Sequence, residues 1–308
     1  MTTAVPVTET KSLQSPPTKL QKILRRTLVG GTLALGTTGL VLLTSVPQGP
    51  AIVAAIALAL TVGCALEAGR MGILGQPRVA FGAIAGCLAS LAVLYGVFSP
   101  ESSMRVPDWS GPGRYYGALG FCLLASAVVV LVGSLPELVG KRGPRAASAL
   151  SVLGFGLWVA LPLSGLVPLR IFTGAGGLAA IILLSKVGDI VGYYVGSWIG
   201  VTHPFPKLSP NKTTAGCVAS LVAGIVAGAA LAHFGLPVEG GWLHGAWTGG
   251  LLNLAAQAGD LFESRIKRRA EVKDSSALAG ASGGVLDVVD SLLFTVPVAL
   301  CVWPLAFR

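Results

Sequence analysis

The sequence predicts an all-α, polytopic membrane protein with about nine transmembrane helices. Two features of its composition support this fold class: 53% of the residues are hydrophobic, and only 11% are charged. The mean hydropathy of +0.76 is too high for an ordinary soluble domain. The chain also divides into apolar stretches of about 20 residues, the length that a helix needs to cross a bilayer core.

The apolar stretches follow one another along most of the chain. They cover residues 28–46, 51–67, 79–98, 116–138, 147–167, 171–199, 214–234, 242–262 and 286–306. The 42 glycines suit closely packed membrane helices, because small residues let backbones approach. We expect three parts: a disordered cytoplasmic tail over residues 1–20, N-terminal transmembrane helices over 21–170, and C-terminal transmembrane helices with cytoplasmic loops over 171–308.

The basic residues predict the orientation of these helices. If the N-terminus is cytoplasmic, four of the 22 Lys and Arg residues fall on the outer side, namely Arg105, Arg114, Arg170 and Arg308. Cytoplasmic loops carry an excess of basic residues, so the sequence predicts a cytoplasmic N-terminus and an outer C-terminus. The formal net charge of +9 then reflects topology and anionic lipid, and it gives no reason to expect nucleic acid.

The N-terminal half carries few groups suited to chemistry. Glu67 and Glu137 lie at span ends, and we interpret both as solvated helix ends. The five cysteines lie within or at the edges of apolar spans and form no CxxC or Cys/His cluster. This arrangement argues against zinc and against a disulfide framework.

A first polar segment lies around the start of the seventh span. Asp189 continues an apolar helix, where a charge would cost roughly 2.5–3.5 kcal/mol at the bilayer centre, so we place it near the cytoplasmic end, facing a polar cavity. A Ser-Pro-Asn-Lys-Thr-Thr turn at residues 209–214 contains Lys212. Its hydroxyl residues suit helix capping, and a helix N-terminus beside a lysine also suits phosphate. Both interpretations of Ser209 and Thr213 stay open.

A second polar segment places acidic residues at helical spacing. One face of a helix, at i, i+3, i+4 and i+7, is formed by Asp260, Glu263, Ser264 and Lys267. At the start of the last span, the positions i, i+3 and i+4 are again polar: they are Asp287, Asp290 and Ser291. Two acidic faces near one membrane surface would give an oxygen-ligand site for Mg²⁺, which prefers one or two carboxylates with waters and substrate phosphates.

The segment between these faces permits a close approach to a ligand. Gly283-Gly284 allows a tight turn there. The alternative is mutual salt bridging in a cytoplasmic loop, and for the basic residues at 265–269 both interpretations stay open. For Asp260 and Asp287, which lie at the ends of apolar helices, a functional role is favoured.

These residues resemble the signature of the phosphatidate cytidylyltransferase (CDP-diacylglycerol synthase) family. The family pattern runs Gly-Asp-Leu-x-Glu-Ser-x-x-Lys-Arg, four residues, Lys-Asp-Ser, then Pro-Gly-His-Gly-Gly-x-Leu-Asp-Arg-x-Asp-Ser. The matching positions are Gly259, Asp260, Leu261, Glu263, Ser264, Lys267, Arg268, Lys273, Asp274, Ser275, Gly283, Gly284, Leu286, Asp287, Asp290 and Ser291. A second block, an Asp-x-x-x-Tyr helix followed by Leu-Ser-Pro-x-Lys-Thr, matches at Asp189, Tyr193, Ser209, Pro210, Lys212 and Thr213.

Several positions depart from this pattern. The family Pro-Gly-His is replaced by Gly280-Ala281-Ser282, Val288 replaces an arginine, and Ala215 replaces a glutamate. Loss of the imidazole and the guanidinium removes groups that would orient substrate, whereas the carboxylates remain. We therefore expect a divergent active member, with an inactive relative as the alternative.

The resemblance implies transfer of CMP from CTP to phosphatidic acid, which yields CDP-diacylglycerol and pyrophosphate for phospholipid synthesis. It implies Mg²⁺ bound by Asp260 and Asp287 with support from Asp290, and a monovalent cation such as K⁺ beside it. The implied catalytic residues are Asp260, Asp287, Lys267 and Asp290. The implied substrate-binding residues are Asp189, Ser209, Lys212, Thr213, Ser264, Arg268, Lys273, Asp274, Gly283 and Gly284.

The resemblance also implies a homodimer in the bacterial inner membrane, with the active site facing the cytoplasm, where CTP is found. One alternative is a relative that is inactive or that uses another lipid phosphate or a polyprenol acceptor. A transporter is disfavoured, because transporters often carry polar breaks in both halves of the chain. Here the polar residues lie in the C-terminal half and at one membrane face.

Overall fold

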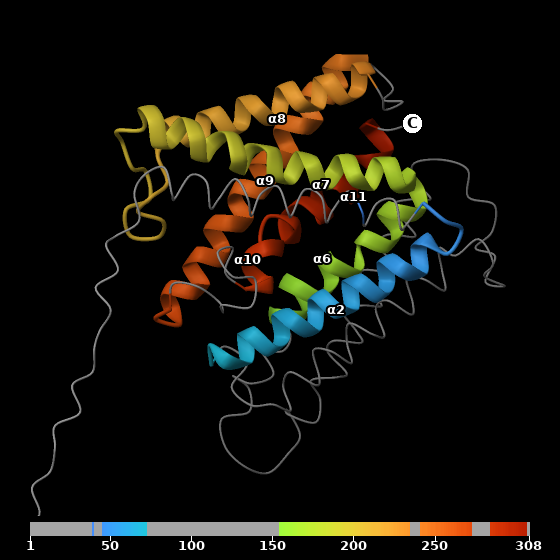
Figure 1. Cartoon of the computed structure of the whole chain (residues 1–308), viewed down its shortest axis with the longest axis horizontal. Coiled ribbons are helices and arrows are strands. Elements are labelled where there is room, and N and C mark those ends of the chain that lie inside the picture. Colours follow the sequence, from blue (N-terminus) through green and yellow to red (C-terminus); the bar gives the residue numbers. More distant parts are fainter. Residues whose placement is uncertain (1–38, 40–44, 73–153, 235–240, 273–283, 307–308) are drawn as a thin grey trace, which may run out of the picture.

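The computed structural model describes residue 39 and residues 45–72, 154–234, 241–272 and 284–306. Throughout these ranges the regular structure is helical (Figure 1). The elements are α2 (Gly49–Arg70), the π-helical turn η1 (Gly156–Ala160), α6 (Leu161–Ser164), α7 (Leu166–Ile199), α8 (Thr214–Phe234), α9 (Gly241–Arg269), α10 (Val285–Val289) and α11 (Leu292–Ala306). The all-α expectation is confirmed for this part of the chain.

Four helical stretches are long and apolar enough to cross a membrane. They are Gly49–Arg70, Gly156–Ile199, Thr214–Phe234 and Val285–Val302. Helix α9 contains the predicted span 242–262 and is long enough to cross, but it carries more polar residues. The predicted spans 79–98 and 116–138, and nearly all of 28–46, lie outside the described residues. The number of nine helices, the domain limits and the orientation therefore stay predictions.

A break at Gly174 divides the long apolar stretch in two. Gly174 has φ 69° and ψ −176°, a conformation that glycine adopts readily and other residues avoid. Figure 1 shows the green ribbon turning sharply between α6 and the long arm of α7. The sequence predicted separate spans over 147–167 and 171–199, and this turn lies close to their boundary.

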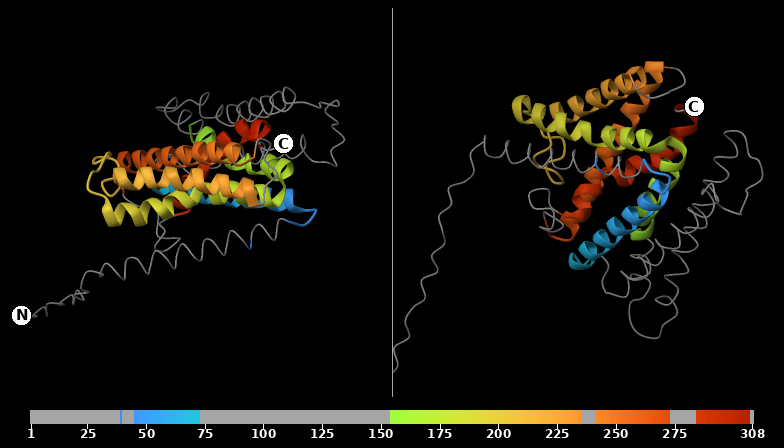
Figure 2. Two further views of the ribbon diagram at one scale, coloured as in Figure 1. Left: turned by 90° about the horizontal axis from the view of Figure 1, so that it is seen from above. Right: turned by 45° about the vertical axis from the view of Figure 1, so that its right-hand side comes forward.

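Helices α7, α8 and α9 pack side by side through glycines (Figure 2). A Cβ atom added at Gly228 of α8 would lie 2.2 Å from the carbonyl oxygen of Gly245 in α9. One added at Gly192 of α7 would lie 2.8 Å from the carbonyl oxygen of Gly216 in α8. These backbones touch because both sides lack a side chain, as in many membrane helix pairs. We call this three-helix contact the glycine seam.

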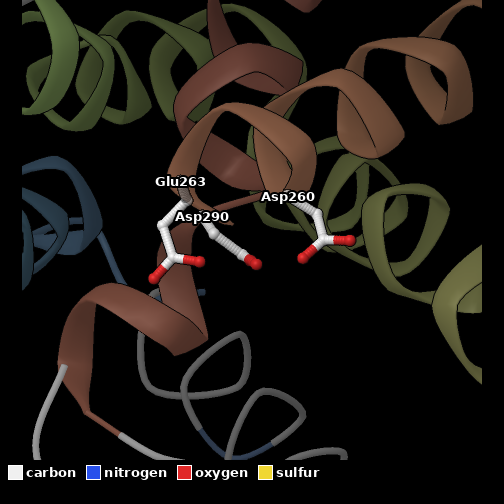
Figure 3. A group of neighbouring side chains, drawn as sticks. All are labelled: Asp260, Glu263 and Asp290. Atoms are coloured by element: carbon white, nitrogen blue, oxygen red, sulfur yellow. The ribbon is translucent and has the colours of Figure 1, made fainter. Parts of the chain in front are cut away.

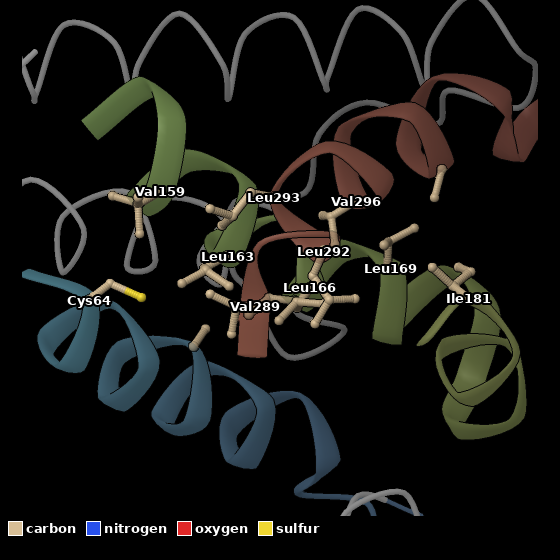
Figure 4. Close-up of a cluster of buried hydrophobic side chains, with 14 of the residues drawn as sticks. Cys64, Val159, Leu163, Leu166, Leu169, Ile181, Val289, Leu292, Leu293 and Val296 are labelled. Atoms are coloured by element: carbon tan, nitrogen blue, oxygen red, sulfur yellow. The ribbon is translucent and has the colours of Figure 1, made fainter. Parts of the chain in front are cut away.

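The buried apolar core surrounds α10 and the start of α11 (Figure 4). Side chains from α2, η1, α6, α7, α10 and α11 meet there, among them Cys64, Val159, Leu163, Leu166, Leu169, Ile181, Val289, Leu292, Leu293 and Val296. The short helix α10 thus packs against α2 and the core, and its Asp287 pairs with Lys267 of α9. This packing fixes the position of the two aspartates that α10 and the following turn carry.

Candidate functional site

Four elements bring charged side chains to one place near the C-terminal end of α9. The last turns of α9 carry Asp260, Glu263 and Lys267, and the α10–α11 segment carries Asp287 and Asp290. Two further lysines come from α7 and from the turn before α8. These elements are far apart in the chain, and the glycine seam and the apolar core bring them together.

Three carboxylates form the centre of the site. Oxygen atoms of Asp260, Glu263 and Asp290 all lie within 4.8 Å of one another (Figure 3). Glu263 is 1% exposed and Asp290 is 8% exposed. Gly259 makes this approach possible, because a Cβ atom there would lie 2.5 Å from the carbonyl oxygen of Asp290. The close packing of α9 against α10–α11 therefore sets the carboxylate spacing.

Three lysines surround these acids. Lys212 Nζ lies 2.5 Å from Asp260 Oδ2, and Lys186 Nζ lies 3.4 Å from Asp290 Oδ1. Lys267 Nζ lies 2.7 Å from Glu263 Oε2 and also pairs with Asp287. The four carboxylates of these pairs thus face three ammonium groups. This local excess of negative charge favours one additional cation.

The environment of Glu263 supports the same conclusion. Burial raises the pKa of Glu263 to about 9, and the charges of Asp290 and Asp287 add to this, although Lys267 opposes it. Burial alone would lower the pKa of Lys267, but Glu263 and Asp287 outweigh burial and raise it. A bound cation would oppose this rise, so the raised pKa of Glu263 agrees with a site that takes one more positive charge.

The donor set fits a hard divalent cation. Both carboxylate oxygens of Glu263 are buried; Oε2 is paired with Lys267 Nζ, and Oε1 has no hydrogen-bond donor among the described residues. Mg²⁺ and Ca²⁺ take carboxylate oxygens as ligands, and Mg²⁺ also keeps waters and substrate phosphates. Asp260, Glu263 and Asp290 offer such oxygens without nitrogen or sulfur ligands.

Asp287 lies beside this trio and outside it. Its Oδ2 accepts a 2.6 Å hydrogen bond from the backbone N–H of Gly284, and its Oδ1 pairs with Lys267. The sequence predicted Asp260, Asp287 and Asp290 as metal ligands. The structure brings Asp260 and Asp290 together with Glu263, and Asp287 is linked to Glu263 through their shared lysine.

The predicted substrate-binding residues on the α7–α8 side lie at or near the same site. The charge of Asp189 interacts with those of Lys186, Asp290, Asp260 and Lys212. The hydroxyl oxygen of Thr213 accepts the N–H of Gly216 at 3.1 Å, so it caps the start of α8. Ser209 forms the preceding turn, in which its carbonyl oxygen accepts the N–H of Lys212.

The other predicted residues lie toward the end of α9. Ser264 is half-buried on the turn that carries Asp260 and Glu263. Arg268 is exposed and donates to the carbonyl oxygens of Leu208 and Val272 at 3.4 and 3.3 Å. The predicted residues Lys273, Asp274 and Gly283 lie outside the described residues, as does the departure at Ser282.

Sequence reasoning did not assign roles to three residues that the structure brings to the site. Their spacing could have pointed to two of them: Glu263 shares a helical face with Asp260, and Lys186 precedes Asp189 by three residues. Glu67 was interpreted as a solvated helix end, and this was wrong: it is fully buried and accepts hydrogen bonds from the backbone of α10. Local spacing carries no signal for a contact across 218 positions.

Comparison with known proteins agrees with this site. The model of the Cytidylyltransferase family matches residues 26–305. The chain is 34% identical over 177 residues to the phosphatidate cytidylyltransferase of Pseudomonas aeruginosa, which covers 56% of this chain and 64% of that protein. It is 37% identical over 112 residues to the enzyme of the same name from Aquifex aeolicus, covering 36% and 41% of the two chains.

A similar match extends to the phosphatidate cytidylyltransferase of Mycobacterium leprae, at 37% identity over 131 residues, covering 42% of this chain and 40% of that protein. The matched segments thus span between 40% and 64% of the lengths of these curated relatives. The family model, in contrast, extends over nearly the whole chain. Together with the apolar helices and the clustered carboxylates and lysines, it shows that this integral membrane protein belongs to the cytidylyltransferase family.

Proposed function

We propose that the chain transfers CMP from CTP to phosphatidic acid, forming CDP-diacylglycerol and pyrophosphate for phospholipid synthesis. The observation that carries the proposal is the cluster of Asp260, Glu263 and Asp290 with three lysines at the end of apolar helices. Both substrates are anionic phosphates, and one of them is a membrane lipid. Family membership and the names of the relatives support the same reaction.

The carboxylate cluster would hold Mg²⁺, with Asp260, Glu263 and Asp290 as ligands and Asp287 beside them. When bound, the ion would neutralise charge on the phosphates of CTP. Asp287 would act mainly by holding Lys267 in place, since it already pairs with that lysine. A monovalent cation such as K⁺ would lie beside the Mg²⁺.

The lysines would bind phosphate oxygens once the carboxylates bind the metal. Lys212 and Lys267 each pair with a carboxylate of the cluster, and a bound cation weakens the hold of those carboxylates on the ammonium groups. In the reaction, a phosphate oxygen of phosphatidic acid attacks the α-phosphorus of CTP. The bond from that phosphorus to the bridging oxygen of the β-phosphate breaks, and pyrophosphate leaves. Positioning and charge neutralisation supply the catalysis.

The lipid would approach from the apolar surface of the helices. A groove of about 630 Å³ lies between α7 and α8, lined among others by Val191, Val195, Val218 and Val222. It reaches Thr214, two residues after Lys212, so an acyl chain lying in it would bring a headgroup near that lysine. The excess of basic residues on the predicted inner side favours a site that faces the cytoplasm of a bacterial inner membrane. A homodimer is part of the same proposal and follows from the family resemblance.

Purified full-length protein in lipid nanodiscs provides the test. With CTP, Mg²⁺ and phosphatidic acid, we expect CDP-diacylglycerol and pyrophosphate in equal amounts. Asp260→Asn should abolish product formation, whereas Glu271→Gln, at an exposed residue beyond α9, should leave the rate unchanged. A chain that is inactive with phosphatidic acid and active with a polyprenyl phosphate would overturn the assignment of the acceptor. A chain inactive with both would overturn the activity.

A further inference from the structure

Glu67 connects the N-terminal part of the chain to the site. It lies in the last turn of α2 and is fully buried. Its Oε1 accepts the backbone N–H of Val285 at 2.8 Å, and its Oε2 accepts the N–H of Leu286 at 2.9 Å. The first N–H groups of a helix lack partners within the helix, and a carboxylate placed there is favoured by the helix dipole.

The same helix start is occupied by a second carboxylate. The N–H of Gly284 donates to Asp287 Oδ2 at 2.6 Å, so three consecutive backbone donors are bound by two acidic side chains of the protein. A substrate phosphate would have to displace these carboxylates to bind there. The arrangement therefore suits the positioning of α10 better than direct binding of an anion.

Packing reinforces the contact between α2 and α10. A Cβ atom added at Gly63 would lie 3.1 Å from methyl groups of Val285, and Leu286 is fully buried. Asp287 follows Leu286 directly, and Asp290 lies one helical turn further along. A shift at the first turn of α10 would therefore move both aspartates relative to Lys267 and to Glu263.

We propose that Glu67 is a positioning residue of the active site. It fixes the start of α10 so that Asp287 faces Lys267 and Asp290 takes its place in the carboxylate cluster. It acts through the backbone of α10 and touches neither substrate nor metal. The inference rests on the proposed function, and it adds to the site a residue from the N-terminal part of the chain.

The test uses full-length Glu67→Gln and Glu67→Asp in nanodiscs. Glutamine keeps the length but loses the charge and one acceptor; aspartate keeps the charge but is too short to reach both donors. Loss of residues that support metal ligands typically lowers metal affinity about 10–100-fold. We therefore expect the Mg²⁺ concentration for half-maximal activity to rise about 10-fold or more in Glu67→Gln. Glu67→Asp should show a smaller rise, and the KM for CTP at saturating Mg²⁺ should change little.

Binding of Mn²⁺ alone, measured by electron paramagnetic resonance, gives a readout that does not need turnover. We expect the same order of weakening for Glu67→Gln and none for Glu271→Gln, which makes the same charge change at an exposed position. If both Glu67 variants lose activity only in proportion to the folded fraction, with unchanged Mg²⁺ midpoint and Mn²⁺ affinity, the inference is wrong. If the wild type binds Mn²⁺ but makes no CDP-lipid, the proposed function fails, and the Mn²⁺ comparison still decides the role of Glu67.

Discussion

At the scale of single residues, the site is defined by which lysine pairs with which carboxylate. Lys267 pairs with both Glu263 and Asp287, so one ammonium group serves two carboxylates. Glu263 has the least exposed side chain of these acids and belongs to the carboxylate cluster. Its protonation state should therefore report whether a cation is present.

This leads to a prediction about pH. The pKa of Glu263 in the folded, metal-free protein is raised to about 9 from an ordinary value of 4.5, mainly by burial. Between these values the folded state binds more protons than the unfolded state, so stability should fall as pH rises through that window. Denaturation of the metal-free protein at several pH values measures this fall. Glu263→Gln should flatten it, and an equal slope in wild type and variant would contradict the assignment.

A second prediction concerns the cation ligand from the last span. Asp290→Asn keeps the shape of the side chain but removes its charge next to Asp260 and Glu263. The carboxylate would hold the cation that stabilises negative charge in the transition state. Without it, we expect the rate of CMP transfer to fall by about 10²–10³-fold. Rates measured over a range of Mg²⁺ concentrations check this. A variant with a near-normal rate and Mg²⁺ midpoint would show that Asp290 is no ligand.

At the scale of helices, the backbone contact at Gly259 determines how closely α9 approaches the last span. In Gly259→Ala the new Cβ atom would lie 2.5 Å from the carbonyl oxygen of Asp290, and neither backbone can yield without moving a helix. A displacement of about 1 Å can lower a rate by the order of 10²-fold, so we expect a loss of that size. Gly176→Ala in α7, where a Cβ meets no atom within 4 Å, is the matched control for the CMP-transfer assay.

The break in α7 gives a second prediction at this scale. Gly174 and Gly176 both have open space around an added Cβ atom, but only Gly174 has a positive φ. Gly174→Ala should therefore destabilise the protein by about 1–3 kcal/mol through backbone strain alone. Gly176→Ala should be neutral or slightly stabilising, because alanine favours a helix. Denaturation in detergent compares the two, and equal stabilities would show that the turn does not depend on the glycine conformation.

The helices and their charged faces could be predicted because their signals are local. The spacing of Asp260 and Lys267 placed both on one side of α9, and the apolar lengths located α2, α7 and α8. Contacts between distant helices carry no such signal. The pairing of Lys186 with Asp290 spans 104 positions, and it depends on how the helices pack rather than on any periodicity.

At the scale of the whole molecule, the exposed turn before α8 allows the orientation of the helices to be measured. Asn211 is exposed in the turn that carries Lys212, which the distribution of basic residues predicts to be cytoplasmic. A cysteine introduced at position 211, in a variant whose five native cysteines are replaced by serine, should react with a membrane-impermeant maleimide in inside-out vesicles. Right-side-out vesicles should protect it. Reaction only in right-side-out vesicles would reverse the predicted topology.

The glycine seam constrains which sequences can encode this protein. At Gly228, Gly245 and Gly249 an added Cβ atom would lie 2.2–2.3 Å from a carbonyl oxygen of the opposite helix. Even a methyl group is too large for these positions. On the outward faces of the same helices, exposed residues such as Phe234 and Leu254 have no such limit, and apolar side chains of many shapes can replace one another there. Natural variation should therefore divide sharply between the two sides of each helix.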